Sequence, residues 1–128
     1  MADGELFKPG RFLTHRTLAS VVADPATINA TNFPPASGFS AYQCQSVWIV
    51  WHGTGGTGTD TITVVPLIWD GINSIWSTLA AITLTKDKMA ELYLYGSSTV
   101  FLQITTVSST TATALTVNVA KAHSEVVE

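Results

Sequence analysis

The sequence predicts an all-β protein built as an antiparallel sandwich or a small barrel, and three observations support this class. Runs of Thr, Val, Ile and aromatic residues, which suit a pleated surface, recur through the chain. Turn residues separate these runs about every 8–12 positions, which is the spacing of sandwiches and small barrels. A helical period is hard to find anywhere. The 128 residues fit a single domain.

Residues 1–40 predict an extended N-terminal arm in place of regular strands. Pro9 and Pro25 lie in expected turns, and Pro34 and Pro35 stiffen the chain because each proline fixes its own φ and restricts the preceding residue. The segment Arg16 to Ala23 is compatible with one short strand. Isolated apolar residues along the arm are candidate anchors on another surface, namely Leu6, Phe7, Phe12, Leu13, Ile28 and Phe33.

Residues 41–123 are expected to form the β-domain, and residues 124–128 an acidic tail. The segment Val47 to Trp51 is apolar on both faces, which is typical of a central strand covered on both sides. Pro66 cannot donate a ladder hydrogen bond, so its strand is expected at an edge or at a bulge. At most one helical turn is expected, near Lys86 to Ala90. The expected strands are Tyr42–His52, Asp60–Trp69, a short one at Trp76, Ala80–Thr85, Ala90–Tyr95, Thr99–Val107 and Thr113–Lys121.

The composition favours assembly with other chains. Charged residues make up 12% of the chain and the mean hydropathy is +0.30, whereas about 25% charged residues is usual. A small domain with so little charge is expected to bury part of its surface in a complex. The alternative is a monomer whose surface is covered by Thr and Ser. The net charge of −3 comes with no basic stripe, so nucleic acid is not an expected partner. Neither a signal peptide nor a transmembrane helix is expected from the apolar runs.

No arrangement of residues predicts catalysis, a metal or a cofactor. Cys44 is the single cysteine and is expected in the core; along one strand it lies too far from His52 to form a reactive pair. Asp60, Asp70 and His52 could meet at one end of a hairpin, but no ligand motif enforces this. The run Gly53–Gly58 lacks the lysine and the helix of a phosphate loop, so it is expected to be a hairpin tip. The chain is therefore expected not to be an enzyme.

The four tryptophans have three possible uses: core, protein interface or sugar platform. Trp48 and Trp51 differ in parity along one strand, so they point to opposite faces and one of them is expected in the core. Tryptophan is also enriched at protein interfaces. We rank the core first, an interface second and a sugar platform third.

From Tyr42 onward the chain resembles small β-sandwich structural proteins of tailed bacteriophages, such as capsid decoration or cement proteins. The resemblance covers about two thirds of the chain and is one of style, without a diagnostic motif. It is carried by four segments: Val47–Trp51 with the Gly/Thr loop after it, Thr61–Asp70, Leu92–Gly96 and Val100–Thr105.

This resemblance implies a jelly-roll-like sandwich on the capsid surface of a virion, frequently a homotrimer, made in the host cytoplasm, whose arm clamps the major capsid protein. It brings no catalytic residues and no cofactor. A tail or neck component and a carbohydrate-binding module remain the alternatives. The residues expected to contact a partner are Leu6, Phe7, Arg11, Phe12, Leu13, Phe33, Trp51 and Trp69.

Overall fold

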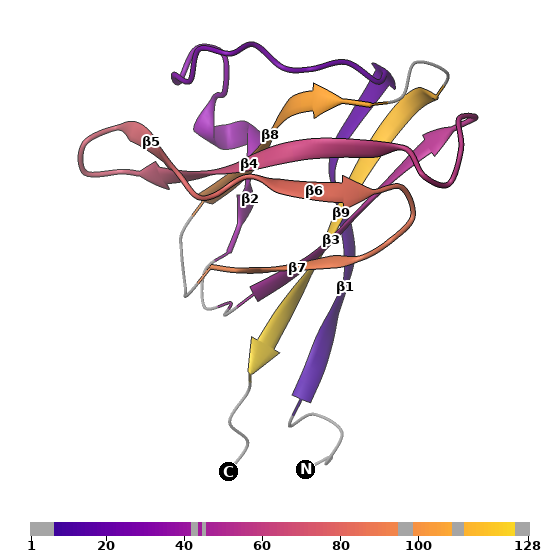
Figure 1. Cartoon of the computed structure of the whole chain (residues 1–128). Helices are drawn as coiled ribbons and strands as arrows, with labels where there is room; N and C mark the ends of the chain where they lie inside the picture. Colours follow the sequence, from indigo (N-terminus) through magenta and orange to yellow (C-terminus); the bar gives the residue numbers. More distant parts are fainter. Residues whose placement is uncertain (1–6, 42–43, 45, 95–98, 109–111, 125–128) are drawn as a thin grey trace.

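The computed structural model of the chain describes residues 7–41, 44, 46–94, 99–108 and 112–124. It contains strands and a single 3-10 turn, η2 (Pro35–Ser37) (Figure 1). In the part described, no helix is long and apolar enough to cross a membrane. The strands are β1 (Phe7–Ser20), β2 (Phe39–Ser40), β3 (Ser46–Thr54), β4 (Thr61–Asp70), β5 (Ile75–Thr78), β6 (Ile82–Thr85), β7 (Ala90–Tyr93), β8 (Thr99–Val107) and β9 (Thr113–Ser124).

Two antiparallel sheets pack face to face and confirm the predicted sandwich. Sheet A has the order β1-β9-β3-β7, and sheet B has the order β2-β8-β4-β5, with β6 also paired to β4. The chain is thus folded back on itself, so that β1 lies beside β9 and β2 beside β8. Neighbours of this kind, early strand against late strand in both sheets, are the jelly-roll arrangement that the sequence implied.

The buried apolar residues form two clusters, one between the two sheets and one on the outer face of sheet B. The larger cluster takes its side chains from the inner faces of both sheets, including Trp51, Ile62, Leu102 and Leu115, all fully buried. The smaller cluster joins Phe33, from the loop after β1, to Leu67, Trp76 and Phe101 of sheet B. The second cluster therefore fastens an irregular segment of the first forty residues to the sandwich.

The prediction of a separate arm over residues 1–40 is wrong for residues 7–20. These residues form β1, which pairs with β9 from Phe7 opposite Ser124 to Ser20 opposite Thr113. The short strand expected over Arg16 to Ala23 therefore starts nine residues earlier and ends earlier. Irregular register between Pro9 and Phe12, and again between Thr14 and Arg16, hides the strand from a search for alternation.

Strand β3 is interior in sheet A but is covered on one face only, in contrast to the expected double cover. Val47, Ile49 and Trp51 point into the core, whereas Trp48 is exposed and Val50 is half-buried. The apolar residues on its second face therefore lie on the outer surface of sheet A.

Pro66 lies in a central strand, so the expectation of an edge position is wrong. Strand β4 pairs with β8 on one side, and on the other side with β6 at Thr61–Val64 and with β5 at Leu67–Asp70. Pro66 falls between these two stretches, where its carbonyl accepts a hydrogen bond from the Leu79 amide at 3.0 Å. The Pro66 nitrogen, which carries no hydrogen, points toward the break between β5 and β6. No hydrogen bond between strands is therefore lost at this position.

Two turns also differ from expectation. Residues 55–60 do not close a hairpin, because β3 belongs to sheet A and β4 to sheet B; the segment crosses between the sheets. Gly55 and Gly56 supply the positive φ angles that this crossing needs. The stretch Pro35–Ser37, expected to be extended, forms a 3-10 turn. Near Lys86 to Ala90, where at most one helical turn was expected, the structure has none.

Candidate interaction surfaces

The polar side chains at the loop ends hold the fold and form no reactive cluster. Asp87 Oδ1 lies 2.8 Å from His52 Nδ1, and the Asp60 carboxylate accepts hydrogen bonds from the amide and hydroxyl of Thr57. Asp70 accepts hydrogen bonds within its own turn. Within the described ranges, no three His, Cys, Asp or Glu residues come together as metal ligands. Asp60, Asp70 and His52 thus have separate structural tasks.

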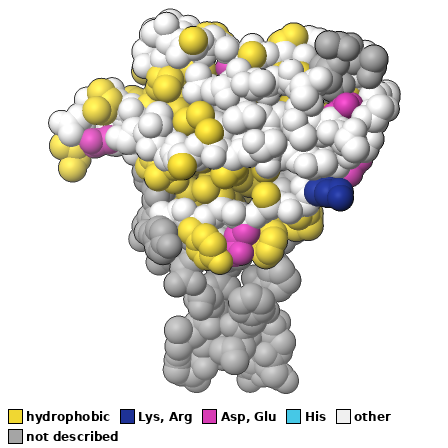
Figure 2. All heavy atoms as spheres, viewed as in Figure 1, with side chains coloured by type: hydrophobic (Ala, Val, Ile, Leu, Met, Phe, Trp, Pro, Cys, Tyr) yellow, Lys and Arg dark blue, Asp and Glu magenta, His cyan; other side chains and the backbone are white. Residues whose placement is uncertain are grey.

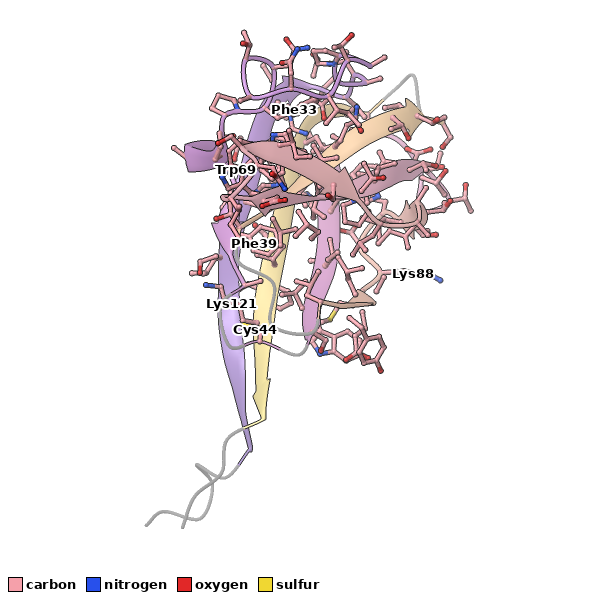
Figure 3. All side chains as sticks on the ribbon, turned by 90° about the vertical axis from the view of Figure 1, so that its left-hand side faces the viewer. Phe33, Phe39, Cys44, Trp69, Lys88 and Lys121 are labelled. Carbon is pink, nitrogen blue, oxygen red and sulfur yellow. The ribbon has the colours of Figure 1, made fainter. Side chains whose placement is uncertain are left out.

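Cys44 is buried, as its place in an apolar strand predicted, although it lies just before β3. Burial raises the pKa of its thiol, and the charge of Lys121 opposes this shift to a smaller extent. The two residues lie together near the lower end of the body in Figure 3. A thiol with a raised pKa is a poor nucleophile, so Cys44 packs as a small apolar residue.

One side of the sandwich is closed by polar side chains that join β1 to β8. Arg16 of β1 makes a two-pronged ion pair with Asp24, with Nη1–Oδ2 at 2.6 Å and Nη2–Oδ1 at 2.7 Å. Asp24 then binds the free edge of β8 twice: its carboxylate accepts from the Ile104 amide at 2.7 Å, and its own amide donates to the Ile104 carbonyl at 2.8 Å. The β8 edge is therefore satisfied where β2 no longer covers it.

His15 also joins β1 to β8, at Leu102, two residues before Ile104. Its Nε2 accepts a hydrogen bond from the Leu102 amide at 3.1 Å, which requires the neutral ring with the proton on Nδ1. Burial, and secondarily the charge of Arg16, lower the pKa of His15 to about 3. The ring packs edge-on against Phe39 and Phe101, with centroids 5.0 and 4.9 Å apart. We call His15, Arg16 and Asp24 the β1–β8 seal.

A shallow groove of about 320 Å³ lies beside the seal. It is lined by residues of β1, of the loop before η2 and of β8, including Arg16, Leu18, Asn32, Pro34 and Phe101. The Arg16 guanidinium, 4.7 Å above the Phe101 ring, is already bound to Asp24, and His15 is neutral. The groove thus offers shape and apolar contact, but no uncommitted charge for an anionic ligand.

Among the expected partner contacts, Phe12 and Leu13 are exposed, each with 47% of its surface accessible. Phe12 lies opposite Ala120 of β9, on the outer face of sheet A. Leu6 lies outside the described residues. Phe7 and Arg11 belong to β1, and the structure describes the backbone at both positions.

Phe33 and Trp51 are not available to a partner, which corrects two of the expected contacts. Trp51 is fully buried, and its Nε1 donates to the Leu84 carbonyl at 2.8 Å. Phe33 is buried against Phe101, and its carbonyl accepts a hydrogen bond from Trp76 Nε1 at 2.8 Å. Both aromatic rings therefore act as core, the use that ranked first for the tryptophans.

Trp69 is half-buried, so a contact through this residue stays a prediction. Its ring packs against Trp76 in a T-shaped pair with centroids 5.1 Å apart, on the side of the molecule seen in Figure 3. A sugar platform needs exposed, coplanar rings. Trp51 and Trp76 are buried and Trp48 is exposed on another face, so the tryptophans do not form such a platform.

The sequence reasoning missed a second group of exposed apolar residues, which lies on and next to β5, β6 and β7. We call it the β5–β7 surface and define it by Ile72, Ile75, Leu79, Met89 and Tyr93. One signal was present: Ile72 stands inside the turn segment Asp70–Ser74, where an apolar residue has no core to enter. Trp48 was also missed as the outward member of the Trp48 and Trp51 pair.

No protein-family model matches the sequence, and no curated protein matches it. The fold is similar to that in the crystal structure of SPBc2 prophage-derived protein YomS, with a TM-score of 0.53 over 90% of this chain and 95% of that chain. The two sequences are 11% identical over this match. The chain therefore has a jelly-roll sandwich fold that is also found in a prophage-derived protein.

Proposed function

We propose that this chain is a non-enzymatic structural protein of a bacteriophage particle, and that it decorates the capsid by binding the major capsid protein. The likeness in fold to a prophage-derived protein supports a phage origin. The low content of charged residues and the exposed apolar side chains support a chain that works in an assembly. Its place of action is the virion surface, after synthesis in the host cytoplasm.

The observation that carries the capsid contact is the exposure of Phe12 and Leu13, which stand on β1 at the edge of sheet A and, as neighbours on one strand, point to opposite faces of the sheet. Both side chains are about half exposed, although they stand on a strand that is paired to β9 along its length. Large apolar groups held on a rigid strand lose little conformational freedom on binding, so they make effective interface anchors. The contact comes from a strand of the sandwich, and not from a loose arm.

Because Phe12 and Leu13 stand on a strand of the sandwich, point substitutions test the contact better than a deletion does. Deletion of residues 1–15 would remove more than half of β1 together with His15, so a loss of binding would not be separable from a loss of fold. We expect Phe12→Asp and Leu13→Asp each to reduce binding to particles prepared without this protein by at least tenfold. Val22→Asp is the matched control, since Val22 is exposed to 52% but lies beyond β1; it should bind as the original protein does.

Cosedimentation with particles measures the affinity, and electron cryomicroscopy of the decorated particles gives the location. Density on the head at regular positions is the expected result. Density confined to the tail or neck would replace capsid decoration with the alternative structural role. Absence of binding by the unaltered protein would overturn the proposal, as would equal binding by the Phe12→Asp variant.

A further inference from the structure

The β5–β7 surface holds half of the large apolar residues that are exposed in the described part of the chain. Ile72 is 94% exposed at the tip of the β4–β5 hairpin, and Met89 is 51% exposed at the turn before β7. Figure 2 views this side of the molecule and shows hydrophobic side chains from the projecting hairpin to the lower end. Exposed apolar side chains that are concentrated on one side of a domain mark an interaction site.

The hairpin tip that carries Ile72 is held in one conformation. Asp70 accepts hydrogen bonds from the amides of Ile72 and Asn73 at 2.9 and 3.2 Å, and from the Asn73 side chain at 2.8 Å. These bonds also lower the pKa of Asp70, so the carboxylate stays ionised and keeps the turn closed. A rigid tip loses little entropy on binding, which favours its use as an anchor.

The exposed area fits one interface with a second copy of this chain. Weighted by their exposed fractions, the five residues present roughly 600 Å² in total, whereas a standard interface buries about 800 Å² on each partner. The remainder can come from neighbouring polar groups. A trimer would need two such interfaces on every subunit, and the surface is large enough for one.

The charges on this side permit self-association. Lys88, which projects from the body in Figure 3, has no ion pair among those that the structure shows. Asp70 at the end of β4 and Glu91 in β7 carry the opposite sign. A surface with both signs at its margins does not repel its own copy. A patch that meets the same patch on a second copy closes as a two-fold dimer.

We propose that the chain forms a two-fold dimer through the β5–β7 surface, in place of the trimer that the sequence resemblance implies. In sheet A, β7 and β1 lie at opposite edges, with β3 and β9 between them. The dimer therefore leaves Phe12 and Leu13 of β1 open for another partner. This inference is independent of the proposed role in a phage particle.

The test is the mass of the free protein, measured by sedimentation equilibrium and light scattering between about 1 and 100 µM. We expect twice the chain mass of 13.6 kDa. Ile72→Asp and Met89→Asp should each raise the dimer dissociation constant at least tenfold. Val22→Asp is the matched control for Met89, with 52% of its surface exposed against 51%, and should leave the constant unchanged. Ile72→Ser provides a milder variant, and circular dichroism checks that each variant folds.

A monomer at all concentrations would overturn the proposal, as would a trimer or a dimer that Ile72→Asp and Met89→Asp do not weaken. Phe12→Asp separates this proposal from the proposed function. That variant should lose particle binding and still dimerise. If the unaltered protein dimerises but does not bind particles, the capsid role fails while the dimer stands.

Discussion

The two edges of the sandwich, the β1–β8 side and the β5–β7 side, differ in how their strands are covered. At the β1–β8 side, His15, Arg16 and Asp24 bind the backbone of β8 in place of a neighbouring strand. At the opposite side, β5, β6 and β7 are strands of four residues each, with apolar side chains exposed beside them. Short edge strands discourage the addition of further strands. The sealed side thus holds the two sheets together, and the apolar side is left for contact with another surface.

The largest effect is expected from breaking the ion pair of the β1–β8 seal. In Asp24→Ala, the partly buried Arg16 guanidinium loses its partner and the Ile104 amide loses its acceptor, which should cost about 3 kcal/mol of unfolding free energy. Urea denaturation measures this cost. Asp24→Asn retains an acceptor for the Ile104 amide and should lose less. A cost below about 1 kcal/mol for Asp24→Ala would mean that the seal does not stabilise the sandwich.

A pH dependence is the second expected effect, and it comes from His15. Its pKa is about 3 in the folded protein and 6.5 in the unfolded chain, so between these values the unfolded chain binds the proton. Stability is therefore full above pH 6.5 and falls by up to about 1.4 kcal/mol per pH unit as the pH drops toward 3. Denaturation curves between pH 7 and 4 measure the slope. His15→Gln should flatten it, and an unchanged slope would assign the effect to other groups.

A smaller loss is expected from Gln103→Ala, also on the sealed side. Gln103 is buried, and its side chain donates a hydrogen bond to the Pro25 carbonyl at 2.9 Å. Removing this bond should cost about 1 kcal/mol, the usual net contribution of a neutral hydrogen bond. The change is measured by the same denaturation curves. If the loss equalled that of Asp24→Ala, we would conclude that the Gln103 side-chain amide and the Arg16–Asp24 ion pair stabilise the fold together and not independently.

The smallest effect on stability is expected at the β5–β7 surface. Ile72→Asp should change the unfolding free energy of the monomer by less than about 0.5 kcal/mol, because Ile72 makes little contact with its own chain. Measurement at low concentration, below the dimer dissociation constant, isolates this effect. A large loss in the monomer would show that the hairpin supports the fold, and the contrast between the two sides would then disappear.

The sequence predicted the bounds of a strand best where turn residues stand directly at its ends. Strand β8, Thr99–Val107, has the expected bounds because serines stand at both of its ends in the sequence, although Val100–Ile104 are all buried and both faces of the strand are covered. Strand β1 escaped prediction because its two irregularities shift the parity of the pattern, and because an edge strand buries few side chains. Alternation is visible in a sequence only where the backbone keeps a constant register.

The interaction surfaces were predictable to a smaller extent. Phe12 and Leu13 were identified as exposed apolar residues, whereas Trp51 was chosen over Trp48, since parity separates the two residues but does not say which faces the core. The pair formed by Arg16 and Asp24 depends on the bend of the chain after β1. Eight residues of separation do not by themselves indicate an ion pair, so this contact required the three-dimensional structure.

The pairing of β1 with β9 has a consequence for biosynthesis. Phe7 pairs with Ser124, so β1 leaves the ribosome before the strand that it pairs with has been made. Contacts that join such distant parts of a chain slow folding, because the loop between them must close before any bond repays the cost. Strand β1 thus lacks its sheet partner until β9 has been synthesised, and during that interval its unpaired edge is open to pairing with other chains.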